Sequence, residues 1–213
     1  MSDTTVDIWI PHGFMAMPLT DIESRIGVVQ GIVGEMESST TKAMAEAILP
    51  AALTLFAELA HRDTRYCGIG RHLSSDGNLI TSCITVCVYE TGGDKLNPRL
   101  RLTNLADSRS ESGEIYNLEM ADVGGRPMMF TERVTELPSP EFPERPFASA
   151  TTATFQLEAV VPSDDGSALA AVELSTAAVD YGPEFRKMIV DMAESIEFRA
   201  SGRTMPRPSS LDL

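Results

Sequence analysis

The feature that most constrains this chain is a pair of stretches that alternate apolar with polar residues on either side of a glycine turn. Residues 65–73 and 79–90 flank the segment 74–78, whose Asp76-Gly77 step is typical of tight turns between strands. The second stretch is rich in β-branched residues, which favour a position inside a sheet. These residues therefore predict a β-hairpin with an interior second strand.

The same period of two predicts further strands along the chain. In chain order they are Val6–Ile10, Glu114–Val123, Arg126–Leu137, Thr152–Val161, Ala168–Ser175 and Ile196–Arg199. Thr152–Val161 and Ala168–Ser175 form a second predicted hairpin, because a turn rich in Ser, Asp and Gly joins them. Residues 95–113 are ambiguous, since leucines recur over 99–105, whereas 108–113 is predicted as a polar surface loop.

Two helical stretches are predicted between the first strand and the first hairpin. Thr20 and Glu23 form a capping box for the first helix. The apolar stripe of this helix is Ile22, Ile26, Val29, Val33 and Met36. Lys42–His61 is the second stretch, in which Pro50 either kinks the helix or begins a separate one, and we favour a separate helix.

The last predicted helix begins at Asp180, which we expect to cap it, with Pro183 in its first turn. Its buried stripe is expected to be Phe185, Met188, Ile189 and Met192. Strands grouped between helices, without regular β-α-β alternation, predict an α+β fold in which helices cover a mostly antiparallel sheet. We expect residues 1–199 to form a single domain and residues 200–213 a disordered tail.

Composition and charge exclude several classes of partner. The 17 basic and 31 acidic residues among 213 give a net charge of −14, which repels phosphate backbones and anionic lipids. No segment approaches the ~20 apolar residues that span a bilayer. Three cysteines and an acidic, polar amino terminus favour the reducing cytoplasm. We therefore expect a cytoplasmic protein that binds neither nucleic acid nor membranes.

The carboxyl-terminal pattern resembles a known superfamily. A hairpin ending at residues 172–176, a link to Asp180-Tyr181, the helix with Phe185 and Met192, and the closing segment 195–198 together resemble the end of Mog1/PsbP-like domains. The resemblance implies an antiparallel sheet flanked by helices that serves mainly in protein contacts. It transfers no functional residue, and the stretches 42–61 and 138–146 depart from the superfamily's pattern.

The cysteines and histidines carry no recognisable catalytic motif. On a strand, Cys83 and Cys87 share one face about 13 Å apart, too far for a disulfide. Whether Cys67 faces them depends on strand register, and we expect all three to be buried, small apolar residues. His12, His61 and His72 are expected at the surface, and only folding could join Cys67 to His61 or His72 in a dyad.

No metal or cofactor site is predicted. Gly68-Ile69-Gly70 lies inside a strand and opens no helix, so it lacks the context of a phosphate-binding loop. Gly124-Gly125 is best explained as a turn. Asp164-Asp165 provides too few ligands for a cation on its own.

The proline-rich segment 138–147 contains the one predicted partner-binding site. Phe142 and Phe147 lie between its prolines. Their rings either anchor the segment to the sheet or are exposed and insert into pockets on a partner.

These patterns favour a non-catalytic protein-interaction domain, similar in role to an adaptor or chaperone, that binds another protein or a second copy of itself. A small-ligand module is the alternative, with an apolar pocket lined by some of the 11 methionines. An enzyme whose active site is assembled only by folding is a third hypothesis.

Overall fold

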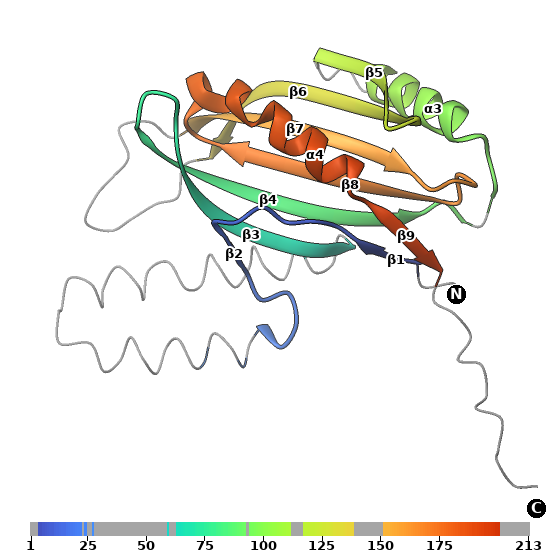
Figure 1. Ribbon diagram of the computed structural model, residues 1–213, viewed down its shortest axis with the longest axis horizontal. Coiled ribbons are helices and arrows are strands. Elements are labelled where there is room, and N and C mark those ends of the chain that lie inside the picture. The colour runs from blue at the N-terminus through green and yellow to red at the C-terminus, as the bar shows by residue number, and fades with distance from the viewer. Residues whose placement is uncertain are drawn as a thin grey trace, which may run out of the picture.

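The computed structural model describes residues 4–22, 24, 27, 59, 63–92, 94–111, 117–138 and 151–200 (Figure 1). In chain order the elements are β1 (Thr4–Asp7), β2 (Phe14–Ala16), β3 (Thr64–Leu73), β4 (Leu79–Glu90), α3 (Pro98–Glu111), β5 (Asn117–Val123), β6 (Arg126–Pro138), β7 (Thr151–Pro162), β8 (Ala168–Thr176), a 3₁₀ helix (Val179–Phe185), α4 (Arg186–Glu194) and β9 (Glu197–Ala200). The described residues therefore form an α+β structure dominated by an antiparallel sheet, as predicted.

The main sheet has seven strands in the order β2-β3-β4-β8-β7-β6-β5, and all neighbouring strands are antiparallel. Three pairs, β3–β4, β5–β6 and β7–β8, are hairpins of strands adjacent in the chain. The predicted turn at Gly124-Gly125 is confirmed, because both residues have positive φ (57° and 81°), a conformation that glycine adopts without strain. Strand β4 lies inside the sheet, as its β-branched residues predict.

One face of the sheet packs against the 3₁₀ helix and α4, which cross it in Figure 1. We call it the α4 face. From the sheet, Ile84, Val172 and Leu174 are buried here, and from α4, Ile189 and Met192. The predicted stripe of the last helix is confirmed, because Phe185, Ile189 and Met192 are buried and Met188 packs against the same core.

The amino-terminal strand is shorter than predicted and begins earlier. β1 covers Thr4–Asp7 and pairs with β9, so the first and last strands of the described chain lie side by side (Figure 1). The predicted strand Val6–Ile10 is wrong beyond Asp7. There the chain leaves the ladder, and the Trp9 N–H donates to Ser195 Oγ (3.0 Å) instead of to a strand partner.

The other face of the sheet is covered in part by α3, and we call it the α3 face. Leu102 is buried against Met129, Val160 and Ala171. The predicted polar loop at 108–113 is wrong over residues 108–111, which belong to this helix.

The helix α3 forms although its apolar pattern is weak, because its first turn is capped. The Asn97 side chain accepts the Arg99 N–H (2.9 Å), and Pro98 occupies the first helical position. Both features favour the start of a helix at this point.

The predicted cap at Asp180 is also wrong. A 3₁₀ helix beginning at Val179 precedes α4, Asp180 lies inside its first turn, and no side chain caps it. The Thr176 hydroxyl accepts the Ala178 N–H (3.1 Å) just before this helix begins.

Several predictions fall outside the described residues. They are most of the helix beginning near Thr20, nearly all of Lys42–His61, the proline-rich residues 139–150 and the tail beyond residue 200. Among the helices that are described, none is long and apolar enough to cross a bilayer.

Candidate functional site

Beyond the area covered by α3, the α3 face becomes polar. The strand register places Thr131, Glu158, Glu173 and Thr85 in one row across β6, β7, β8 and β4. The next row contains Arg133, Gln156, Ser175 and Cys83. These residues alternate with the buried residues of the α4 face, because successive side chains of a strand point to opposite sides.

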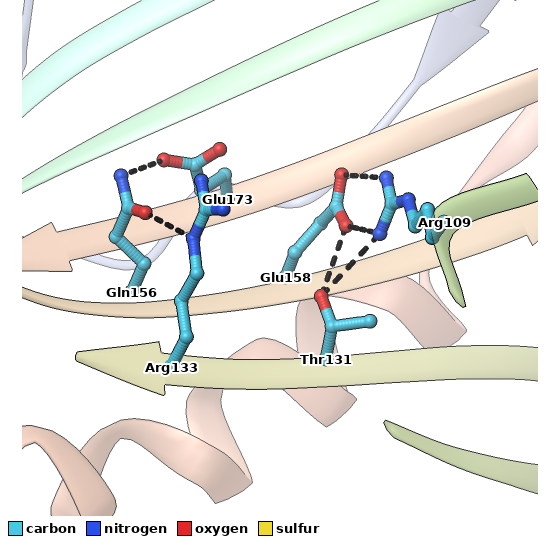
Figure 2. A pocket seen from close by; sticks show the side chains of 6 residues that line it. All are labelled: Arg109, Thr131, Arg133, Gln156, Glu158 and Glu173. Carbon is cyan, nitrogen blue, oxygen red and sulfur yellow. Dashed lines mark hydrogen bonds and ion pairs between the residues drawn. The ribbon is translucent and has the colours of Figure 1, made fainter. Parts of the chain in front are cut away.

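A small hollow of about 130 Å³ lies at the centre of these rows (Figure 2). Its lining comes from α3 and three strands: Arg109, Thr131, Arg133, Gln156, Glu158 and Glu173. The two arginines and two glutamates balance in formal charge. A hollow of this size admits a few water molecules or a small polar group rather than an apolar ligand.

On the α3 side of the hollow, Glu158 accepts hydrogen bonds from two other lining residues. Both terminal nitrogens of Arg109 donate to its carboxylate, Nη2 at 3.0 Å from Oε1 and Nη1 to Oε2. Thr131 Oγ1 donates to Oε2 at 3.1 Å. Figure 2 shows the three side chains converging from α3, β6 and β7. A forked pair of this kind attaches the last turn of α3 to the sheet.

A second chain of hydrogen bonds leads to Glu173. Arg133 Nε donates to Gln156 Oε1 (2.6 Å), and Gln156 Nε2 donates to Glu173 Oε1 (3.2 Å) (Figure 2). Burial raises the pKa of Glu173, the charge of Glu158 raises it further, and Arg133 and Arg109 oppose the shift. Chemically, the Glu173 carboxyl group can hold a proton at a higher pH than an exposed glutamate does.

The three cysteines lie on the α3 face and are free thiols. Cys67 Sγ lies 3.9 Å from Cys83 Sγ, and Cys87 Sγ lies 3.4 Å from Thr64 Oγ1. The prediction that Cys83 and Cys87 share a face is confirmed by their positions in the ladder. The prediction of burial is correct for Cys67, which is 2% exposed, but wrong for the other two, which reach partly to the surface.

The histidines have different surroundings. His12 lies in an exposed turn, as predicted, and His61 is outside the described residues. The predicted surface position of His72 is wrong, because its ring packs between Phe14 and Phe185, with centroids 4.7 and 5.6 Å away. Burial there lowers the pKa of His72.

That position also excludes one of the two dyads considered for Cys67. His72 lies on the α4 face and Cys67 on the α3 face, because they are five positions apart along β3 and an odd step along a strand changes the face. A Cys67–His72 dyad is therefore impossible in this fold. The Cys67–His61 dyad involves a residue outside the described ones.

The end of the α3 face that β2, β3 and β4 form carries exposed apolar side chains. Met15 (67% exposed) lies opposite Ile69 (41%), and Leu73 (74%) lies opposite Leu79 (61%). These four residues are called the apolar patch below. Between its two pairs, Arg71 lies opposite Thr81.

The remaining candidate residues are the two phenylalanines of the proline-rich segment and the acidic residues of the β7–β8 turn. Phe142 and Phe147 are outside the described residues. Asp165 is held by Ser167, Ser163 and Lys95, and hydrogen bonds from Ser167 are the main reason that its pKa is lowered. The part of the chain that is described contains no group of three His, Cys, Asp or Glu side chains suited to a metal ion.

The sequence prediction missed the polar hollow, although one signal was present. Glu158 and Glu173 interrupt otherwise apolar strands at positions where the alternation points them to the same face. Compared with known proteins, the chain matches no protein-family model and no curated protein.

Proposed function

We propose that this protein is a non-catalytic interaction domain, adaptor-like or chaperone-like, that docks a partner protein on the β2–β4 end of its α3 face. The observation that carries the proposal is the apolar patch. Single exposed apolar residues are normal on protein surfaces, whereas clustered ones mark contact sites. Here strand register places the four side chains as two directly opposed pairs on one face.

The charges beside the patch indicate the chemistry of the partner. β2 and β3 have no acidic residue, and β4 has only Glu90 at its far end, whereas β3 carries Arg65 and Arg71. These three strands therefore carry a small positive charge in a chain with a net charge of −14, and the nearby acidic residues Asp63 and Asp76 lie just outside them. A contact segment with apolar side chains flanked by Asp or Glu would match this end of the sheet in both respects.

The same arginines disfavour self-association through this face. A twofold interface places the same patch of both copies together. Arg71 of one copy would then approach the arginines of the other, and like charges at an interface reduce affinity. The proposed occupant is therefore a different protein, not a second copy of this chain.

The proposal also covers the superfamily and the cellular location of the protein. The resemblance to Mog1/PsbP-like domains is supported by the order of the final hairpin, helix and closing strand, and that superfamily serves mainly in protein contacts. A cytoplasmic location is supported by the three free thiols, since such thiols persist in reducing compartments.

The test compares two variants of the full chain. Ile69→Thr combined with Leu73→Ser changes the patch, whereas Val134→Thr changes an equally exposed residue (57%) on the α4 face. Each tagged protein is expressed in the organism that encodes it, and co-purifying proteins are quantified by mass spectrometry. Binding is then measured with the purified partner, using Arg71→Glu as a third variant.

The proposal predicts one partner that binds wild type and Val134→Thr equally, binds the patch variant at least tenfold more weakly, and loses affinity with Arg71→Glu. The crosslinked partner segment should contain apolar and acidic residues. Equal binding of the patch variant would contradict the proposal, as would self-association that depends on the patch or the absence of any stoichiometric partner.

A further inference from the structure

We propose that Cys67 and Cys83 form a reversible thiol-oxidation site that closes to a disulfide when it reacts with a small hydroperoxide. The two sulfurs lie 3.9 Å apart on neighbouring strands β3 and β4, both on the α3 face. In the register, Cys67 lies opposite Thr85 and Cys83 opposite Ile69, so the cysteines are diagonal neighbours. This inference does not depend on the proposed function.

The two sulfurs have different roles. A hydrogen bond joins the two sulfurs, and either thiol can be its donor. With Cys83 as the donor, this bond lowers the pKa of Cys67 although burial opposes the shift. The same hydrogen bond and burial raise the pKa of Cys83, and the charges of Cys67 and Glu173 raise it further. Cys67 is therefore the sulfur that ionises first, and a thiolate is the form of cysteine that attacks.

The reaction has two balanced steps. The Cys67 thiolate attacks one peroxide oxygen, the O–O bond breaks, and the leaving oxygen takes a proton from water to become an alcohol or water. Cys67 is then a sulfenic acid. The Cys83 sulfur next attacks the Cys67 sulfur, the S–O bond breaks, and the departing hydroxide leaves as water with the Cys83 proton. The dithiol loses two electrons and the peroxide gains them.

Closing the bond requires β3 and β4 to adjust, because diagonal neighbours on adjacent strands lie ~7–8 Å apart. The sulfurs must close from 3.9 Å to ~2.05 Å, the normal disulfide length. Gly68 follows Cys67 directly, and the ladder shifts register between Thr64 and Tyr66, so β3 is irregular on one side of Cys67 and has a flexible residue on the other. Cys83 is partly exposed, which gives a molecule as small as hydrogen peroxide a route to the pair.

The experiment treats the reduced, folded full chain with hydrogen peroxide. The remaining thiols are then alkylated in denaturant and counted by mass spectrometry. The inference predicts that alkylated thiols fall from three to one, that the chain loses the mass of two hydrogen atoms, and that peptides linked through Cys67 and Cys83 appear. Dithiothreitol should restore three thiols.

Two variants sharpen the result. Cys87→Ser is the matched control, and it should still lose two thiols. In Cys83→Ser the disulfide should be absent, and dimedone should trap a sulfenic acid on Cys67. Links that include Cys87, links between chains, or survival of both thiols in folded wild type after Cys87 has reacted would overturn the inference. The wild-type mapping decides the matter even if a variant does not fold.

Discussion

Replacing Arg109 with methionine should destabilise the fold by about 2–3 kcal/mol, because the change leaves the Glu158 carboxylate without its ionic partner. The side chains of Arg109 and Glu158 are only 23% and 16% exposed, so water replaces little of the lost interaction. Thr131 would still donate to Glu158, but the carboxylate of Glu173 lies opposite Glu158 on β8. Removing one partner of a fully buried ion pair costs about 3–5 kcal/mol, and the partial exposure of this pair reduces that figure.

The assay is urea unfolding together with thermal melting. In a chain of this length about 2–4 °C accompanies each kcal/mol, so the melting temperature should fall by roughly 4–12 °C. The double variant with Glu158→Met should recover much of the loss, because no buried charge is then left alone. Arg99→Met removes a more exposed pair with Asp122 and should cost under about 0.5 kcal/mol. Equal losses for Arg99→Met and Arg109→Met would refute the reasoning.

Three further outcomes are expected. Folding raises the pKa of Glu173 above 4.5, its ordinary value, so wild type should lose stability as pH rises from 4.5 to the pKa of Glu173 in the folded state. Urea unfolding at a series of pH values should show this loss for wild type and not for Glu173→Gln. Gly166→Ala should cost about 2–4 kcal/mol, since its Cβ would lie 2.0 Å from the Leu96 carbonyl oxygen and its φ is +67°, whereas Gly77→Ala meets no atom within 4 Å and should cost about 1 kcal/mol by the same melts. Ile84→Ala should cost about 2–5 kcal/mol in chemical unfolding, while Leu79→Ser in the exposed patch should stay within about 0.5 kcal/mol.

The strands of the main sheet were the most predictable part of the fold. Predicted and observed ends of β3, β4, β7 and β8 agree within one residue, because each strand contributes apolar residues to the α4 core and turn residues bound each hairpin. The helix α3 was not predictable in the same way. It buries Leu102 alone in a mostly polar helix, and its start depends on the short Asn97-Pro98 signal.

The polar hollow could not be assembled from sequence. Its residues come from α3, β6, β7 and β8, and only the strand register shows that Glu158 and Glu173 are direct neighbours. The same holds for the thiol pair, since Cys67 and Cys83 meet only in the observed register. The apolar patch could be suspected from Ile69 and Leu73, but their exposure depends on which side of the sheet the helices cover.

The most direct test of the docking proposal is site-specific photo-crosslinking in living cells. A photoreactive amino acid at position 69 probes the apolar patch, and the same residue at position 134 probes the opposite face. The account predicts a crosslink from position 69 to one different protein, through a segment with apolar and acidic residues, and none to that protein from position 134. Crosslinks to it from both positions, from position 134 alone, or from position 69 only to a second copy of this chain would contradict the account.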